Sequence, residues 1–225
     1  MAARGGQQRI PRPPSFRPGR PAPWGHIEPA SRRLPLAEVR ARLATLPPAA
    51  GVVPLAAGSR AAAVLVPLFE EAGEARVILT KRPETMPSHQ GEIAFPGGKY
   101  DPDLDANLEA TARREAWEEV GIEPDAVDVV ARLEGIATIA SQFTITPFVG
   151  FLPGRPALSP DPREVVAVFD VALSELMADG VYREERWDTW RADLDVHFYE
   201  LTGETVWGAT ARILTGFLSH IATGR

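Results

Sequence analysis

Cysteine is absent from the 225 residues of the sequence. This absence excludes disulfide bonds, thiolate metal sites and a cysteine nucleophile, so a bound metal ion would need oxygen or histidine-nitrogen ligands. The sequence also lacks an apolar run of the roughly 18 residues that a membrane helix requires, and its first residues lack the apolar core of a secretory signal. We therefore expect a soluble, cytoplasmic protein without a membrane partner.

Positive charge is scarce outside the first 33 residues. These residues contain seven arginines and one acidic residue, Glu28, which leaves 17 of 24 basic and 29 of 30 acidic residues for the rest of the chain. An acidic body disfavours a nucleic-acid-binding surface, since contacts to phosphates dominate that kind of affinity. The length and composition suit one principal globular domain.

Proline and arginine dominate the beginning of the chain, in a segment with few apolar residues. Such a composition cannot build a hydrophobic core. We predict that residues 1–35 form a disordered tail and that residues 36–225 form a single domain. A nucleic-acid or targeting role is the alternative to a solvated extension, and we favour the extension.

Apolar patterns predict a mixed sheet covered by helices. Strands are expected at 61–71 and 75–82 as a hairpin, and at 91–95, 126–140, 144–152, 164–173 and 196–201. Helices are expected at 36–46, 107–120, 174–178 and 206–221, and Gly121 should end the second of these. This order predicts an α/β or α+β fold in which a mixed β-sheet is sandwiched between helices.

Three glutamates lie on one face of the helix expected at 107–120. At 100° per residue, the side chains of Glu115, Glu118 and Glu119 share a face about 100° wide. Like charges three and four residues apart repel each other by a few tenths of a kcal/mol per pair. A compensating partner is therefore expected for this face.

Two partners could offset that repulsion. The first is solvent together with Arg113 or Arg114. The second is a divalent cation such as Mg²⁺, which binds carboxylate oxygens together with water and substrate phosphates. The Gly97–Gly98 pair, predicted to form a turn, suits the second explanation because glycine lets backbone amides approach a phosphate closely.

The stretch from Gly97 to Ile122 resembles the Nudix box, the motif of enzymes that hydrolyse a nucleoside diphosphate linked to another moiety. Its end matches the pattern Arg-Glu-x-x-Glu-Glu-x-Gly-aliphatic, with Arg114, Glu115, Glu118, Glu119, Gly121 and Ile122. The resemblance implies a Nudix-like fold and a pyrophosphohydrolase that requires Mg²⁺ or Mn²⁺. Family members also have Gly and Glu where this chain has Tyr100 and Ala106, and Asp101 or Asp105 could replace that glutamate.

A second stretch, just upstream, resembles the coenzyme A pyrophosphatase branch of the same family. The matching residues are Leu79, Thr80, Arg82, Gly91, Phe95, Pro96, Gly97 and Gly98. The implied small-molecule partner is coenzyme A or acyl-CoA, hydrolysed to 3',5'-ADP and 4'-phosphopantetheine or its acyl form. The alternatives are a Nudix pyrophosphatase of another nucleoside diphosphate derivative, such as ADP-ribose or NADH, and a non-catalytic Nudix-like binding domain.

The resemblance also implies roles for the carboxylates. It makes Glu115 and Glu119 metal ligands, with Glu118 as a further ligand or as the catalytic base that orients water. Arg114 would fix a glutamate through a charged hydrogen bond. Glu164 precedes an apolar strand and could act as an additional catalytic carboxylate.

Four residues are candidates for substrate binding, namely Arg82, His89, Gly97 and Gly98. A guanidinium matches phosphate geometry in a bidentate way, so Arg82 is the expected phosphate clamp, and a solvated strand end is its alternative. The oligomeric state is left open, with a homodimer as one arrangement.

Overall fold

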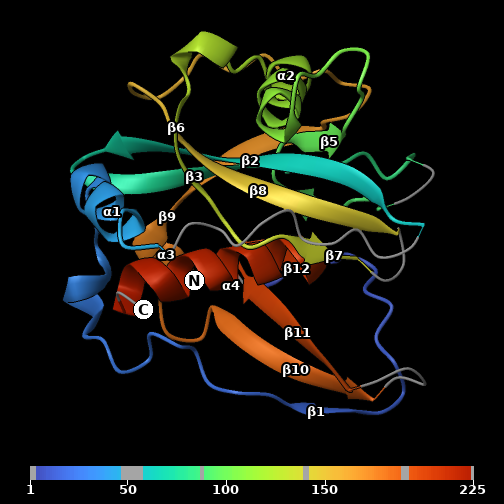
Figure 1. The fold of residues 1–225 in the computed structure, drawn as a ribbon. Helices are drawn as coiled ribbons and strands as arrows, with labels where there is room; N and C mark the ends of the chain where they lie inside the picture. Colours follow the sequence, from blue (N-terminus) through green and yellow to red (C-terminus); the bar gives the residue numbers. More distant parts are fainter. Residues whose placement is uncertain (1–3, 47–57, 87–88, 139–141, 189–192, 224–225) are drawn as a thin grey trace.

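The computed structural model describes residues 4–46, 58–86, 89–138, 142–188 and 193–223. In this part of the chain, helices and sheets stack in layers (Figure 1). Helix α2 (Leu108–Val120) covers one face of the larger sheet, and helix α4 (Gly208–Thr223) lies on the other face. A second, smaller sheet packs beyond α4. The predicted sandwich of a sheet between helices is confirmed.

The larger sheet is mixed. Its strands are β2 (Arg60–Glu71), β3 (Glu74–Lys81), β4 (Ile93–Ala94), β5 (Gly97–Lys99), β6 (Asp128–Arg132), β7 (Ile136–Ala137), β8 (Phe143–Phe151) and β9 (Ala167–Ala172). The order is β4-β3-β2-β8-β6, with β5 on β2, β7 on β8 and β9 on β3. Strands β2 and β8 are parallel and β2 and β3 form the predicted antiparallel hairpin. Part of the predicted strand 126–140, residues 139–140, lies outside the described residues.

Helices α1 (Leu36–Leu43) and α3 (Leu173–Leu176) lie close to their predicted positions. The 3₁₀ helices η1 (Pro29–Arg32) and η2 (Pro124–Ala126) were not predicted. Helix α2 begins where the Asn107 side chain accepts a hydrogen bond from the Ala110 amide at 2.9 Å, and it ends at Gly121 with φ of 76°. Both ends follow local capping rules. None of the helices in the described ranges is long and apolar enough to span a bilayer.

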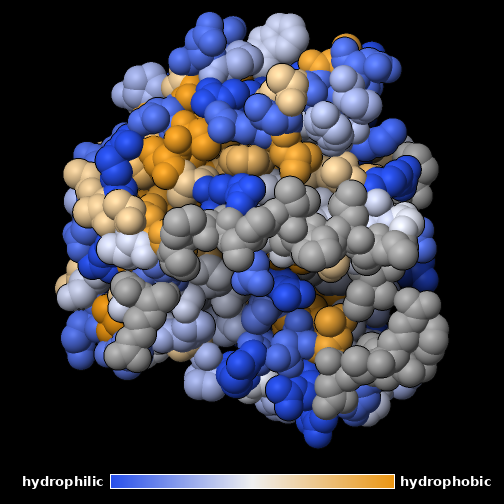
Figure 2. Space-filling model, in the orientation of Figure 1, coloured by the Kyte–Doolittle hydropathy of each residue, from blue (hydrophilic) through white to orange (hydrophobic). Residues whose placement is uncertain are grey.

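The second sheet contains β1 (Phe16–Pro18), β10 (Tyr182–Asp188), β11 (Asp193–Glu200) and β12 (Thr205–Trp207), in the order β1-β10-β11-β12. Strands β1 and β10 were not predicted, because charged residues obscure an apolar pattern in both. Residues 206–207, predicted to begin the last helix, lie instead in strand β12, and α4 begins at Gly208. In β10, ion pairs to the neighbouring strand stand where an apolar pattern was expected: Arg186 lies opposite Asp195 of β11, at 3.0 Å. Hydrophilic residues accordingly predominate in the lower part of Figure 2, where this sheet lies.

The prediction of a disordered tail over residues 1–35 is wrong for residues 4–35. Strand β1 pairs with β10, and Trp24 is only 1% exposed, with its indole N–H donating to the Met177 carbonyl at 3.1 Å. The Arg32 guanidinium donates to the same carbonyl at 2.7 Å. The segment has too few apolar residues for a core of its own, but it covers the core that the rest of the chain builds.

Candidate active site

Two carboxylates of α2 lie directly over β5. A Cβ atom on Gly98 would come within 2.4 Å of the Glu115 carboxyl carbon, and the Gly97 amide donates to Glu119 Oε2 at 3.3 Å. Gly97 and Gly98 belong to strand β5, which pairs with β2, and not to the predicted turn. Glycine is required there because it lets the carboxylates of α2 approach the sheet.

Glu119 is a buried carboxyl group with few partners. Its residue is 4% exposed, and among the described residues its carboxylate accepts one hydrogen bond, from Gly97. Burial is the main reason that its pKa is raised to about 8; the Gly97 amide and Arg82 oppose the shift, and the charges of Glu115 and Glu164 add to it. Burial also raises the pKa of Glu115. These two carboxylates are suited to binding a cation.

Arg114 connects the remaining acidic groups. Its Nε and Nη2 atoms donate to the two oxygens of Asp105 at 2.8 and 2.9 Å. Its Nη1 atom lies 2.9 Å from both Glu118 Oε2 and Glu115 Oε1. Arg114 thus pairs with two of the predicted site carboxylates, Glu115 and Glu118, while Asp105 fixes the Arg114 side chain.

Asp105 has a role that the sequence only suggested as one of two alternatives. Its side chain is 1% exposed and also accepts hydrogen bonds from Thr111 Oγ1 at 2.9 Å and from the Asp101 amide at 3.1 Å. The hydrogen bonds from Arg114 are the main reason that its pKa is lowered to about 2. Asp105, one residue before Ala106, therefore supplies the carboxylate that Ala106 cannot.

The donor chemistry of the α2 face fits Mg²⁺ or Mn²⁺, although the side chains do not yet form a complete site. Across the described ranges, no three acidic or histidine side chains converge closely enough to hold a metal ion. Arg114 is the reason, because it engages Glu115 and Glu118 itself. All the candidate ligands are carboxylates, which suit these cations, and Glu119 has no ion pair within the described part of the chain.

Arg82 lies next to this cluster. Its positive charge acts on Glu119, and its Nε atom is buried without a hydrogen-bond partner among the described residues. A buried, unpaired guanidinium nitrogen costs free energy unless an acceptor is supplied. An anionic ligand that binds beside Glu119 would supply that acceptor.

Glu164 lies near the cluster, whereas His89 lies in another loop, where the Arg82 charge acts on it. The charge of Glu164 acts on both Glu115 and Glu119, so the fold brings this residue to the carboxylates. His89 is exposed, and its Nδ1 atom lies 2.8 Å from Glu92 Oε2. That contact is the main reason that its pKa is raised. A substrate contact by His89 stays a prediction.

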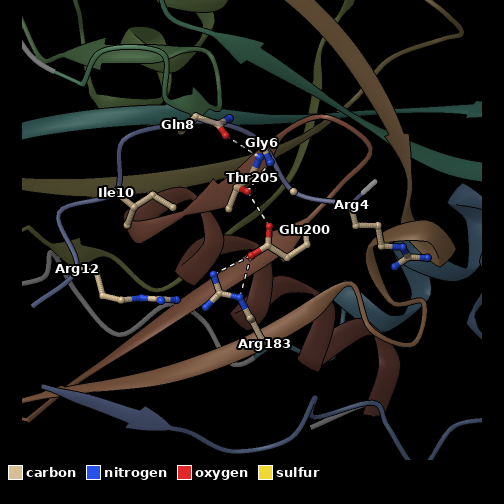
Figure 3. A pocket seen from close by; sticks show the side chains of 9 residues that line it. Arg4, Gly6, Gln8, Ile10, Arg12, Arg183, Glu200 and Thr205 are labelled. Atoms are coloured by element: carbon tan, nitrogen blue, oxygen red, sulfur yellow. Dashed lines mark hydrogen bonds and ion pairs between the residues drawn. The ribbon is translucent and has the colours of Figure 1, made fainter. Parts of the chain in front are cut away.

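Two cavities lie outside the carboxylate cluster. One of about 460 Å³ lies between the N-terminal segment and the second sheet (Figure 3). Two of its arginines already have acidic partners: Arg183 pairs with Glu200 at 2.7 Å, and Arg12 pairs with Glu185. The other, of about 410 Å³, lies beside the start of α2. Neither is lined by Glu115, Glu118 or Glu119, so we assign the candidate active site to the α2–β5 seam.

Comparisons with known proteins agree with this geometry. Residues 59–192 match the model of the NUDIX domain. Nudix hydrolase 22, a chloroplastic protein of Arabidopsis thaliana, is 43% identical over 160 residues, which cover 68% of this chain and 52% of that protein. The chain thus spans about half the length of this plant relative. An uncharacterized Nudix hydrolase, NudL of Cronobacter sakazakii, is 39% identical over 69% of this chain and 79% of its own.

A solved structure shows the same fold. The MutT/nudix family protein from Enterococcus faecalis superposes with a TM-score of 0.50 at 16% identity, over 74% of this chain and 63% of that chain. The domain match, the relatives and the carboxylates on α2 all lead to one assignment. The chain belongs to the Nudix hydrolase family.

Proposed function

We propose that the protein hydrolyses the diphosphate of coenzyme A or of its acyl thioesters, giving 3',5'-ADP and 4'-phosphopantetheine or its acyl form. The observation that carries the proposal is the Nε atom of Arg82, which is buried and has no hydrogen-bond partner among the described residues, in a side chain whose charge acts on Glu119. Arg82 belongs to the stretch that resembles the coenzyme A pyrophosphatase branch, and so do Gly97 and Gly98 below the carboxylates. The branch-like stretch therefore forms one wall of the site where a diphosphate would bind.

The residues of this site suit substitution by water at a phosphorus atom. Arg82 binds diphosphate oxygens in a bidentate way. The water oxygen bonds to phosphorus, the bond from phosphorus to the bridging oxygen breaks, and Glu118 or Glu164 accepts the proton from water. Glu115, Glu119 and Glu118 would hold Mg²⁺ or Mn²⁺, which when bound supplies positive charge to the diphosphate and lowers the pKa of water.

Parallel assays on three substrates test the proposed substrate. We expect kcat/KM for coenzyme A to exceed the values for ADP-ribose and NADH by about ten-fold or more. Polar groups of the site that pair with coenzyme A would be left unpaired when ADP-ribose or NADH binds. The measurement is steady-state hydrolysis with Mg²⁺ under identical conditions. A preference for ADP-ribose contradicts the coenzyme A assignment, and absence of turnover for all three supports a binding domain instead.

The affinity for a divalent cation should depend on pH. Glu119 is protonated below its pKa of about 8 and must lose that proton to bind a cation. The apparent affinity should therefore rise with pH, by up to about ten-fold per unit, until the pH reaches about 8. Calorimetric titration with Mn²⁺ from pH 6 to 9 measures this, in buffers that differ in ionisation enthalpy so that the released proton is counted. An affinity that is independent of pH contradicts ligation by Glu119.

A further inference from the structure

Lys81, the last residue of β3, and Arg82, the residue after it, point to opposite sides of the sheet. Side chains alternate along a strand, and Ile78 packs in the core under α2 whereas Leu79 packs in the core around α4. The Arg82 side chain therefore lies on the α2 side with Ile78, and Lys81 lies on the α4 side with Leu79. The effect of the Arg82 charge on Glu119 agrees with this placement.

On the α4 side, Lys81 is tied to the N-terminal segment through one glutamate. Lys81 Nζ lies 2.6 Å from Glu204 Oε1, in an ion pair whose two side chains are about one quarter exposed. The Gln8 side chain donates to Glu204 Oε2 at 2.5 Å and accepts from the Thr205 amide at 3.2 Å. We call Gln8, Glu204 and Lys81 the clasp; Figure 3 shows Gln8 and Thr205 on the wall of the nearby cavity.

The backbone at the clasp carries two candidate site residues. The Lys81 carbonyl accepts a hydrogen bond from the Val166 amide at 2.9 Å, and Val166 follows Glu164 by two residues. The next residue, Arg82, donates its amide to the Glu92 carbonyl at 3.0 Å. A displacement of Lys81 would therefore move Arg82, its direct neighbour in the chain, relative to the carboxylates of α2.

We propose that Glu204 is a positioning residue for the hydrolytic reaction. Together with Gln8 of the N-terminal segment, it holds Lys81 on the α4 side of the sheet, so that Arg82, the next residue, keeps its place on the α2 side. The N-terminal segment thereby becomes part of the support of the active site. This inference rests on the pyrophosphohydrolase activity but not on the choice of coenzyme A as substrate.

The test is a double-mutant cycle between Glu204→Gln and Arg82→Ala. Glu204→Gln keeps the shape of the side chain but removes the charge that Lys81 pairs with. With the nucleoside diphosphate that the wild-type protein turns over fastest, kcat/KM should fall by about ten-fold, because small displacements of positioned groups are costly. In the Arg82→Ala background, the same change should alter kcat/KM by less than about two-fold, since the two effects are coupled.

A matched control comes from the same cavity wall. Glu200 hydrogen-bonds Thr205 and Arg183 within the second sheet and is not paired with Lys81, so Glu200→Gln should leave kcat/KM unchanged. If Glu204→Gln does not fold, Gln8→Ala replaces it, because that variant keeps the ion pair and loses only its tie to the N-terminal segment; we expect a fall of about three-fold that again vanishes in the Arg82→Ala background.

Two results would overturn the proposal. One is an unchanged kcat/KM in the Glu204 variant. The other is an equal loss in both backgrounds, which would mean that the substitution acts on the whole fold rather than through Arg82. Neither result depends on whether coenzyme A is the substrate, because the wild-type substrate comparison decides that separately.

Discussion

Replacing Glu119 by glutamine should lower hydrolysis by about a thousand-fold or more, because a carboxylate that faces the reacting phosphates is lost together with its charge. The fold should persist, since the glutamine amide fits the same volume and its oxygen can still accept the Gly97 hydrogen bond. Steady-state kinetics with saturating Mg²⁺ measures the loss. Glu109→Gln is the matched control, because Glu109 lies on the same helix but pairs with Arg113, away from the cluster.

The same variant should stabilise the metal-free protein at high pH. The pKa of Glu119 is raised from 4.5 to about 8 in the folded state. Its contribution to stability is therefore fully present below pH 4.5 and is lost as the pH rises through about 8, amounting to at most about 5 kcal/mol. Thermal unfolding in a chelator at pH 9 should show a higher Tm for Glu119→Gln than for the wild type, and the difference should shrink at pH 5. A variant with normal turnover, or one with a lower Tm at pH 9, would contradict the role given to Glu119.

Replacing Asp105 by alanine should destabilise the protein by about 3 kcal/mol, because removing one partner of a buried ion pair leaves the other uncompensated. Arg114 would lose both of its strongest hydrogen bonds and turn toward Glu115 and Glu118 alone. Turnover should fall as well, because Arg114 would then hold these carboxylates in place of a cation. Urea unfolding at pH 7 measures the loss of stability.

The pH dependence of that loss identifies its cause. Because the pKa of Asp105 is lowered from 3.8 to about 2, its stabilising effect is present above pH 3.8 and disappears as the pH falls through about 2. The difference between wild type and Asp105→Ala should shrink over the same range. Asp103→Ala is the control in the same loop; Asp103 is exposed, so its replacement should change stability by no more than about 0.5 kcal/mol. A loss that is equally large at pH 2 and pH 7 would mean that packing, rather than the ion pair, explains it.

Local signals made α2 and its acidic face predictable from the sequence. Asn107 and Gly121 mark the two ends of the helix through contacts within a few residues. The shared face of the three glutamates follows from helix geometry alone, and the hairpin of β2 and β3 follows from two apolar runs around one turn. Each of these features depends on residues close together in the chain.

The features that were missed depend on residues far apart or on an irregular loop. Trp24 is buried because Met177 and the second sheet surround it, which no nearby pattern reveals. The pairing of Asp105 with Arg114 depends on how the loop before α2 folds. Gly97 and Gly98 pair with β2 as part of a strand and also leave room for the carboxylates of α2, whereas their sequence resembles a turn.

The pairing of β1 with β10 also has a consequence for the order in which the chain acquires its structure. Phe16 lies opposite Trp187, 171 positions later in the chain (187 minus 16). During synthesis from the N-terminus, the segment before Leu36 therefore waits for nearly the whole domain to emerge before its partners exist. A composition rich in arginine and proline suits this wait, because it keeps an unpaired segment hydrated and discourages pairing with other strands. The residues that resemble a disordered tail in the sequence are thus suited to a strand whose partner emerges much later in the chain.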